Sequence, residues 1–207
     1  MSSLEVFADV RCPFAYVGLR RVLDRRERDG TGPTLVIRAW PLELVNGSPM
    51  HAKATGEKIA AIREQLAPDL FVGFDVDSFG DSSLPAMALT TAAYRHDLQT
   101  GEAVAMAVRE ALFEHGQDVT DPDVLSAIGS AHGVSVDESD HEKVLVDWEE
   151  GKSLGVIGSP HFLVQDKGYF CPGLEISHDE TGLSVVAKQS AFDEFIEKAL
   201  GANSGTL

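Results

Sequence analysis

Cysteine is scarce in this chain of 207 residues, which contains only Cys12 and Cys171. Two cysteines cannot form the disulfide framework of a small secreted domain, and they lack the local Cys and His spacing of a zinc site. No apolar run approaches the roughly 20 residues that cross a bilayer, and no basic stretch followed by an apolar core marks a signal peptide. We therefore expect a cytoplasmic protein with no metal site and no membrane segment.

Basic residues are also few. The chain has 17 Lys and Arg residues against 33 Asp and Glu residues, a formal net charge of −16. Phosphate contacts need a cationic surface, so neither nucleic acid nor an anionic membrane is an expected partner. With 43% hydrophobic residues, the chain is long enough to bury one core, with or without an insertion.

The most informative motif is Cys12-Pro13-Phe14-Ala15, directly after a strand-like run over 4–8. It is a C-x-x-C redox motif without its second cysteine, placed as in a thioredoxin-type active site. A cysteine at a helix N-terminus faces unpaired N–H groups and the positive end of the helix dipole. These lower a thiol pKa from about 8.5 to about 3.5–7.5. We predict that Cys12 is a reactive thiolate that cannot form a disulfide with position 15.

The remaining elements follow from periodicity and capping residues. Strands over 4–8 and 34–40 flank a helix that begins near Cys12, which predicts a βαβ unit with a right-handed crossover. Ser139 and Glu142 resemble a capping box at the start of the last of five middle helices. Strands return over 160–164 and 169–172, around a turn at 166–168, and the final helix is expected between Ser190 and Gly201. The middle helices are expected over 56–67, 85–96, 101–115, 121–133 and 139–148.

This element order predicts an α/β thioredoxin fold, a mixed sheet with a βαβ unit and a C-terminal β-hairpin, interrupted by an all-helical insertion. The core is expected over 1–56 and 146–201. The insertion is expected over 57–145, and residues 202–207 are expected to form a flexible tail.

The loop Gly158-Ser159-Pro160, between two apolar residues and a strand, predicts the second half of the site. X–Pro bonds are usually trans, but with the Cys12 motif upstream we expect a cis Ser159–Pro160 bond facing the sulfur. The free backbone groups of Ser159 would then pair with an extended thiol substrate. We expect Pro13, Phe14, Ser159 and Pro160 to bind substrate. The side chain of His161 should point to the opposite face of the sheet, and Asp9 should orient the turn.

Residues 9–21 (DVRCPFAYVGLRR), residues 113–125 and the loop ending at Pro160-His161-Phe162 resemble the FrnE-like branch of the DsbA superfamily. The resemblance covers nearly the whole chain and implies a thioredoxin fold and thiol chemistry. The superfamily also includes mycothiol-dependent reductases, kappa-class glutathione transferases and hydroxychromene-carboxylate isomerases, and the last two use serine at the Cys12 position. The resemblance implies glutathione or mycothiol as co-substrate, no tightly bound cofactor, and leaves a homodimer open. It also places Ser82-Ser83 near the bound thiol, although a simple helix N-cap is the favoured interpretation.

Ala15 departs from the family pattern, because dithiol members have there the cysteine that resolves the mixed disulfide. Without it the dithiol cycle cannot run in the usual way. The first hypothesis is a monothiol thiol–disulfide oxidoreductase, in which Cys12 forms a mixed disulfide with a small thiol or a protein substrate. The second is a thiol-dependent transferase or isomerase in which Cys12 activates the bound thiol, and the third is a non-catalytic binding protein. Cys171 is expected opposite Phe162, near Cys12 but not touching it, so whether it resolves Cys12 stays open.

Overall fold

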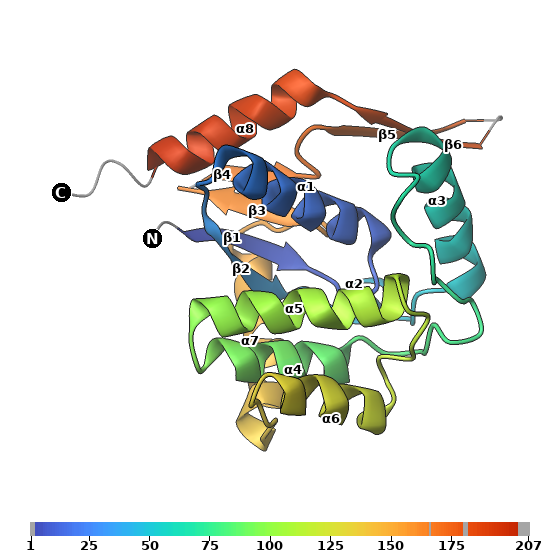
Figure 1. Cartoon of the computed structure of the whole chain (residues 1–207), viewed down its shortest axis with the longest axis vertical. Helices are drawn as coiled ribbons and strands as arrows, with labels where there is room; N and C mark the ends of the chain where they lie inside the picture. Colours follow the sequence, from blue (N-terminus) through green and yellow to red (C-terminus); the bar gives the residue numbers. More distant parts are fainter. Residues whose placement is uncertain (1–2, 166, 180–181, 203–207) are drawn as a thin grey trace.

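The computed structural model describes residues 3–165, 167–179 and 182–202. Its main sheet has the strand order β2-β1-β3-β4. Strands β1 (Ser3–Ala8) and β2 (Thr34–Ala39) are parallel, whereas β3 (His161–Val164) runs antiparallel to β1 and to β4 (Lys167–Phe170). Helix α1 (Pro13–Asp29) connects the parallel pair. The predicted βαβ unit, mixed sheet and hairpin of a thioredoxin fold are therefore present (Figure 1).

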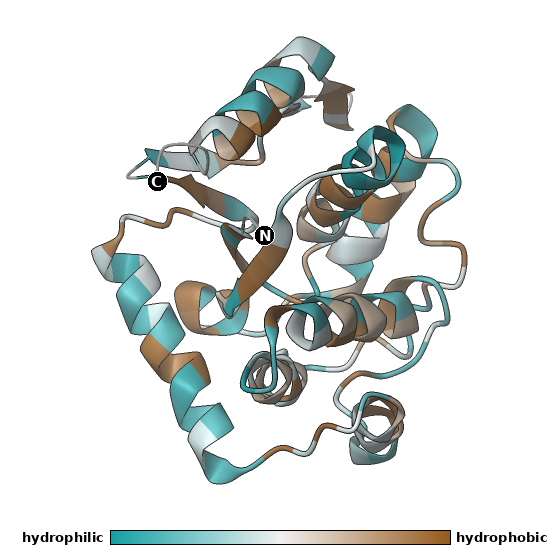
Figure 2. Cartoon of the chain, turned by 60° about the vertical axis from the view of Figure 1, so that its left-hand side comes forward, coloured by the Kyte–Doolittle hydropathy of each residue, from teal (hydrophilic) through white to brown (hydrophobic). Residues whose placement is uncertain are grey.

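Both faces of the sheet are covered by helices. On one face Phe162 of β3 meets Phe195 of α8 (Gln189–Ala202), with ring centroids 5.2 Å apart. On the other face Phe7 and Trp40 lie against Gly151 of α7 (Glu138–Ser153), where an added Cβ would come within 2.7 Å of the Trp40 ring. In Figure 2 the helices carry both teal and brown turns, as expected of elements with one buried side.

The helical insertion lies between β2 and β3 and brings α5 beside α1. Tyr16 of α1 stacks on Phe113 of α5, with ring centroids 5.2 Å apart. The start of α3 precedes the predicted position by four residues, and the short α2 was not predicted. The helices before α7 are α2 (Leu42–Asn46), α3 (Ala52–Gln65), α4 (Leu84–Tyr94), α5 (Leu98–Phe113) and α6 (Pro122–Ala131).

The free edge of β2 is occupied by side chains of the insertion. The Leu35 N–H donates to the Glu102 carboxylate at 2.6 Å, and the Ile37 N–H donates to the Tyr94 hydroxyl at 2.9 Å. The Tyr94 hydroxyl in turn donates to the Leu35 carbonyl at 2.9 Å. An edge strand with unpaired backbone groups invites pairing with another chain. Here the insertion satisfies those groups and fixes itself to the sheet.

The predicted capping box at the start of α7 is wrong by two residues. The side chain of Asp137 accepts from the Ser139 N–H at 2.9 Å, while that of Asp140 accepts from the Asp137 N–H at 2.8 Å. Aspartate is as good an N-cap as serine, and Asp137 comes first along the chain. The helix therefore begins at Glu138.

The segment after β4 contains a hairpin that was not predicted, formed by β5 (Leu174–Asp179) and β6 (Gly182–Ala187). The Gln65 side chain holds it to α3, donating to the Leu183 carbonyl and accepting from the Val185 N–H, both at 2.9 Å. Figure 1 shows the hairpin beside α3.

Two further boundaries differ from the prediction. Strand β4 already begins at Lys167, so the predicted turn residues 167 and 168 belong to the strand, and residue 166 lies outside the described residues. Helix α8 runs from Gln189 to Ala202, so Ser190 is inside it and Gly201 does not end it. Of the predicted tail, residues 203–207 lie outside the described residues.

Candidate active site

Cys12 is the N-cap residue of α1, and Pro13 is at the first helical position. Its backbone is extended, with φ −80° and ψ 114°, and its carbonyl accepts from the Tyr16 N–H at 3.1 Å. Proline is favoured at this position because its missing N–H would have no helical partner. Strand β1 and this proline thus place Cys12 at the mouth of α1, as predicted.

The loop before β3 meets Cys12 across 147 residues of sequence. The Cys12 Sγ lies 3.2 Å from the Ser159 carbonyl oxygen, within hydrogen-bond distance. The Ser159–Pro160 peptide bond is cis. The Ser159 hydroxyl accepts from the Asp9 N–H at 2.8 Å, which fixes the loop to the end of β1. The two sequence motifs therefore form one site.

The protonation state of Cys12 differs from the prediction. The side chain is only 4% exposed, and this burial raises the pKa of the thiol. The N–H groups of Ala15 and Phe14 and a hydrogen bond from Ser159 act in the opposite direction, but they do not outweigh the loss of solvation. The predicted lowering of the pKa is therefore wrong for this conformation. Cys12 is a thiol, and it donates to the Ser159 carbonyl.

Asp9 is fully buried three residues before Cys12. Its carboxylate accepts from the Arg11 N–H at 2.7 Å, the Leu42 N–H at 2.6 Å and the Ser83 hydroxyl at 2.7 Å. Burial raises the pKa of Asp9, whereas these three donors lower it. The carboxylate therefore joins the turn before Cys12 to the starts of α2 and α4.

Arg11 is a part of the site that the sequence analysis did not single out. It is fully buried, and its Nε donates to the Ser83 hydroxyl at 2.9 Å. Its Nη1 donates to the Gly80 carbonyl at 3.0 Å, and its Nη2 lies 3.3 Å from the Glu43 carboxylate. The guanidinium also lies over the Phe79 ring, 5.0 Å from its centroid. Arg11 thus anchors the loop before α4 to the active-site turn.

The serine pair before α4 takes two different roles. Ser83 is the N-cap residue but makes no side-chain capping hydrogen bond, because its hydroxyl donates to Asp9 and accepts from Arg11. The simple N-cap interpretation is therefore wrong for Ser83. The Ser82 hydroxyl accepts from the Leu84 N–H at 3.2 Å and donates to Glu43 at 2.8 Å.

The predicted substrate-binding residues border this site. Pro13 is buried and Phe14 is half-buried in the first turn of α1. Gly18, one turn further along α1, lies so close to the loop that an added Cβ would be 3.2 Å from Pro160 Cγ. Position 15 is occupied by a fully buried Ala15 methyl group. Helix α1 and the Pro160 loop are thus packed directly against each other.

Two apolar side chains remain exposed on and beside this loop. Ile157 is 72% exposed, and Phe170 is 48% exposed with its ring against Gly158. His161 is buried, and its Nδ1 accepts from the Ile157 N–H at 3.3 Å. It pairs with Phe7 in the strand register, on the α7 face of the sheet. It therefore supports the loop from behind, which agrees with the direction expected for it.

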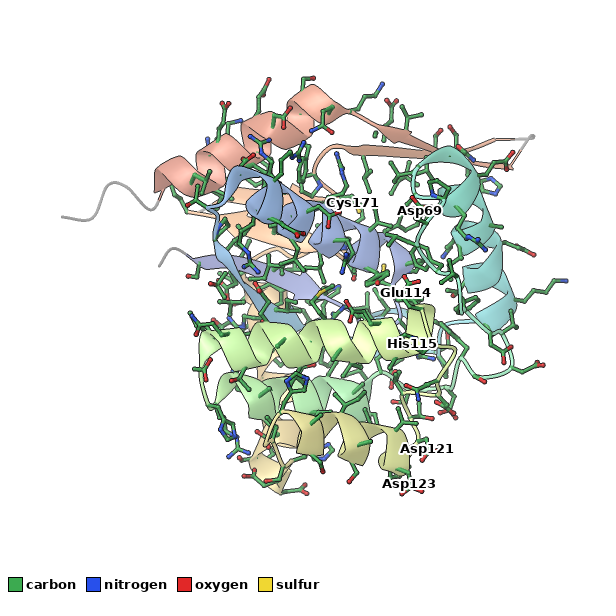
Figure 3. All side chains as sticks on the ribbon, viewed as in Figure 1. Asp69, Glu114, His115, Asp121, Asp123 and Cys171 are labelled. Carbon is green, nitrogen blue, oxygen red and sulfur yellow. The ribbon has the colours of Figure 1, made fainter. Side chains whose placement is uncertain are left out.

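Cys171 (labelled in Figure 3) lies just beyond β4. The register places Tyr169 opposite Phe162, so the prediction that Cys171 lies there is wrong. The Cys171 N–H instead donates to the Pro160 carbonyl at 3.1 Å, and the residue has a φ of 43°. Its thiol is free and buried, and burial raises its pKa, with a smaller contribution from Cys12.

Within the described ranges, no group of three or more His, Cys, Asp and Glu side chains is arranged to hold a metal ion. Nor is any helix in the described part of the chain both long enough and apolar enough to cross a membrane. The polar groups of the site are instead bonded to one another and to the backbone.

Solved structures with the same fold span almost the entire chain. A probable DsbA oxidoreductase from Streptomyces coelicolor superposes with a TM-score of 0.65 at 19% identity, covering 97% of this chain and 91% of that chain. The cytosolic disulfide reductase DsbM from Pseudomonas aeruginosa, in a structure with GSH, gives 0.60 at 16% identity, covering 98% of both chains. A 2-hydroxychromene-2-carboxylate isomerase gives 0.60 at 13% identity, covering 81% and 87%. These identities establish the fold alone.

No curated protein matches the chain in sequence. A family model for DSBA-like thioredoxin domains matches residues 3–178, which include β1, the Cys12 motif, the helical insertion and the Pro160 loop. This match covers most of the chain and agrees with the observed fold. The chain therefore belongs to the family of DSBA-like thioredoxin domains.

Proposed function

We propose that this protein is a thiol–disulfide oxidoreductase that works with a single thiol, Cys12. The observation that carries the proposal is the position of Cys12 Sγ at the N-terminus of α1, 3.2 Å from the Ser159 carbonyl, with Ala15 where a second sulfur would be. Ser159 and Pro160 would position the substrate, with Pro13 and Phe14 bordering it.

The proposed cycle balances with an external thiol. The Cys12 thiol loses its proton to solvent, and the thiolate attacks a substrate disulfide, which forms a mixed disulfide and releases one substrate thiolate. A small thiol then attacks the mixed disulfide, forms a new disulfide with the substrate sulfur and returns Cys12 to the thiol form. Because burial raises the pKa of Cys12, Cys12 is a poor leaving group. Its mixed disulfide is then stable, which favours disulfide reduction over oxidation.

Glutathione or mycothiol is the proposed external thiol. The similarity in fold to a reductase solved with GSH supports this class. Exposed Ile157 and Phe170 would offer apolar contacts to a protein substrate instead. A reducing compartment is proposed as well, since a free reduced thiol must be maintained and the same relative is described as cytosolic.

A transferase or isomerase is the second candidate. It is favoured by the protonated state of Cys12, which donates to a carbonyl and could equally donate to a bound thiolate. In that case the sulfur forms no covalent bond, and the small thiol is itself the nucleophile. A non-catalytic binding protein is the third candidate, in which Cys12 would form no adduct.

Mass spectrometry after incubation with glutathione disulfide tests the proposal. The Cys171→Ser variant should carry one glutathione on Cys12, and the adduct should disappear when a thiol is added. Cys12→Ser should carry no adduct at that position and should not reduce a mixed-disulfide substrate. Transferase activity that survives in Cys12→Ser would favour the second candidate, and failure of Cys171→Ser to form the adduct would contradict the proposal.

A further inference from the structure

Arg109 of α5 is a buried cation that forms no ion pair with any residue of the described ranges. Its side chain is 1% exposed, and its Nη1 donates to the Ala105 carbonyl of the same helix at 2.7 Å. Its Nε has no hydrogen-bond partner among the described residues. A buried charge is costly unless it is paired. The contacts of this guanidinium therefore do not compensate for the free energy that its burial costs the folded protein.

The groups around Arg109 belong to the active-site turn. Ala8 and Val10, on either side of Asp9, line one small pocket together with Arg109. Against the effect of burial, the charge of Asp9 and then those of Tyr94 and Cys12 raise the pKa of the guanidinium. Burial lowers the pKa of Arg109 to about 10, so the group remains a cation at neutral pH. A positive charge therefore faces the turn that carries Cys12.

The other charged groups near Cys12 do not supply a free positive charge. Arg11 is already paired with Glu43, and the Asp9 carboxylate raises the pKa of Cys12. A thiolate at Cys12 would thus be buried next to a carboxylate. The titratable groups that act on Arg109 or on Cys12 are Asp9, Tyr16, Tyr94 and Cys171. Arg11 and Glu43 form an ion pair with each other, and Glu102 acts on Tyr94.

We propose that Arg109 is a positioning residue whose buried charge stabilises the thiolate that Cys12 becomes during thiol–disulfide exchange. This inference rests on the proposed function of Cys12. When Cys12 loses its proton to solvent, the site gains one negative charge, and the fixed cation compensates for it inside the protein, where solvent screens little. The same charge offsets part of the cost that burial places on releasing Cys12 as a thiolate when an external thiol attacks the mixed disulfide.

The test measures the rate of Cys12 alkylation by iodoacetamide against pH, in a Cys171→Ser background that leaves one thiol. At pH 7, where Arg109 keeps its charge, alkylation of Arg109→Met should be about tenfold slower than that of the parent, which corresponds to about one pKa unit. Arg109→Lys keeps the charge and should recover most of the rate. Arg95→Met is the matched control, because it removes a cation of the insertion that pairs with Asp137 and Asp140, and it should leave the rate at pH 7 unchanged.

An alkylation rate at pH 7 that is the same in Arg109→Met and in the parent would overturn the inference, and so would equal losses in Arg109→Met and Arg109→Lys. Failure of Arg109→Met to fold, seen by circular dichroism, would also overturn it, because it would assign the cation a structural role. The proposed function is tested separately by the mixed disulfide of the parent protein. If the parent forms that disulfide while Arg109→Met titrates unchanged, only the inference about Arg109 fails.

Discussion

Replacing Arg109 with methionine should make the folded protein more stable. The substitution keeps an unbranched side chain of similar length at a buried position, and it removes a charge whose Nε has no hydrogen-bond partner in the described part of the chain. Substituting buried charged groups with apolar ones of similar volume is often neutral or stabilising. Most core substitutions lower the free energy of unfolding. An increase would therefore distinguish Arg109 from the other buried residues around it.

The size of the effect follows from the pKa of Arg109. Burial lowers that pKa from the usual 12.5 to about 10; at about 1.36 kcal/mol per pKa unit, holding the charge in the folded state costs about 3 kcal/mol. Losing the bond to the Ala105 carbonyl offsets about 1 kcal/mol. The attraction to Asp9 is already contained in that pKa. We expect a net gain of about 2 kcal/mol, or a rise in Tm of about 4–8 °C.

The stability gained by Arg109→Met depends on pH. Arg109 is a base whose folded-state pKa is lowered, so its cost is fully present below about pH 10 and is lost as pH rises toward the unfolded-state value. Urea denaturation of wild type and Arg109→Met at pH 7 should therefore show a larger difference than at pH 11. A variant that is less stable than wild type at pH 7, by an amount that does not change with pH, would refute this reasoning.

Three further predictions concern the site and the core. Cys12 alkylation in a Cys171→Ser background should still accelerate above pH 9, because burial raises the thiol pKa; a plateau near pH 6 would contradict this. Ser83→Ala should lower the free energy of unfolding by about 2–3 kcal/mol in urea titrations, since Asp9 and Arg11 each lose a buried partner; an unchanged midpoint would be inconsistent with the network. Phe162→Ala, which empties the space between the sheet and α8, should cost about 3–5 kcal/mol, and a loss below 1 kcal/mol would argue against that packing.

The parts of the site that could be predicted from sequence have local signals. Cys12 followed by Pro13 indicates the start of a helix, and the loop around Pro160 indicates the start of a strand. In a thioredoxin fold these two segments lie next to each other, so their contact could be predicted. The β5–β6 hairpin was missed because its turn lacks an Asn-Gly or Asp-Gly signal and its strands are held in place by Gln65, a contact across more than 115 residues.

The charges of the site could not be predicted in the same way. Arg11 and Arg109 are buried, but nothing in the sequence separates them from the half-buried and exposed arginines of α1, since burial depends on how the insertion packs. The pKa of Cys12 shows the same limit. The helix N-terminus is a local feature and favours the thiolate. Desolvation is the larger effect, and it depends on the tertiary packing that buries Cys12 and brings Ser159, 147 residues away, against it.

The proposed chemistry depends on how these opposing effects change when a substrate binds. The Cys12 thiol donates to the Ser159 carbonyl, the same backbone group that would accept an N–H from an extended substrate. A substrate N–H on this oxygen withdraws electron density from the carbonyl and weakens the hydrogen bond that holds the thiol proton. Binding would therefore favour loss of the proton, with the N–H groups of Phe14 and Ala15 and the Arg109 cation in place to stabilise the thiolate. In the proposed cycle the resting thiol is protected by burial, and the substrate itself helps to produce the nucleophile.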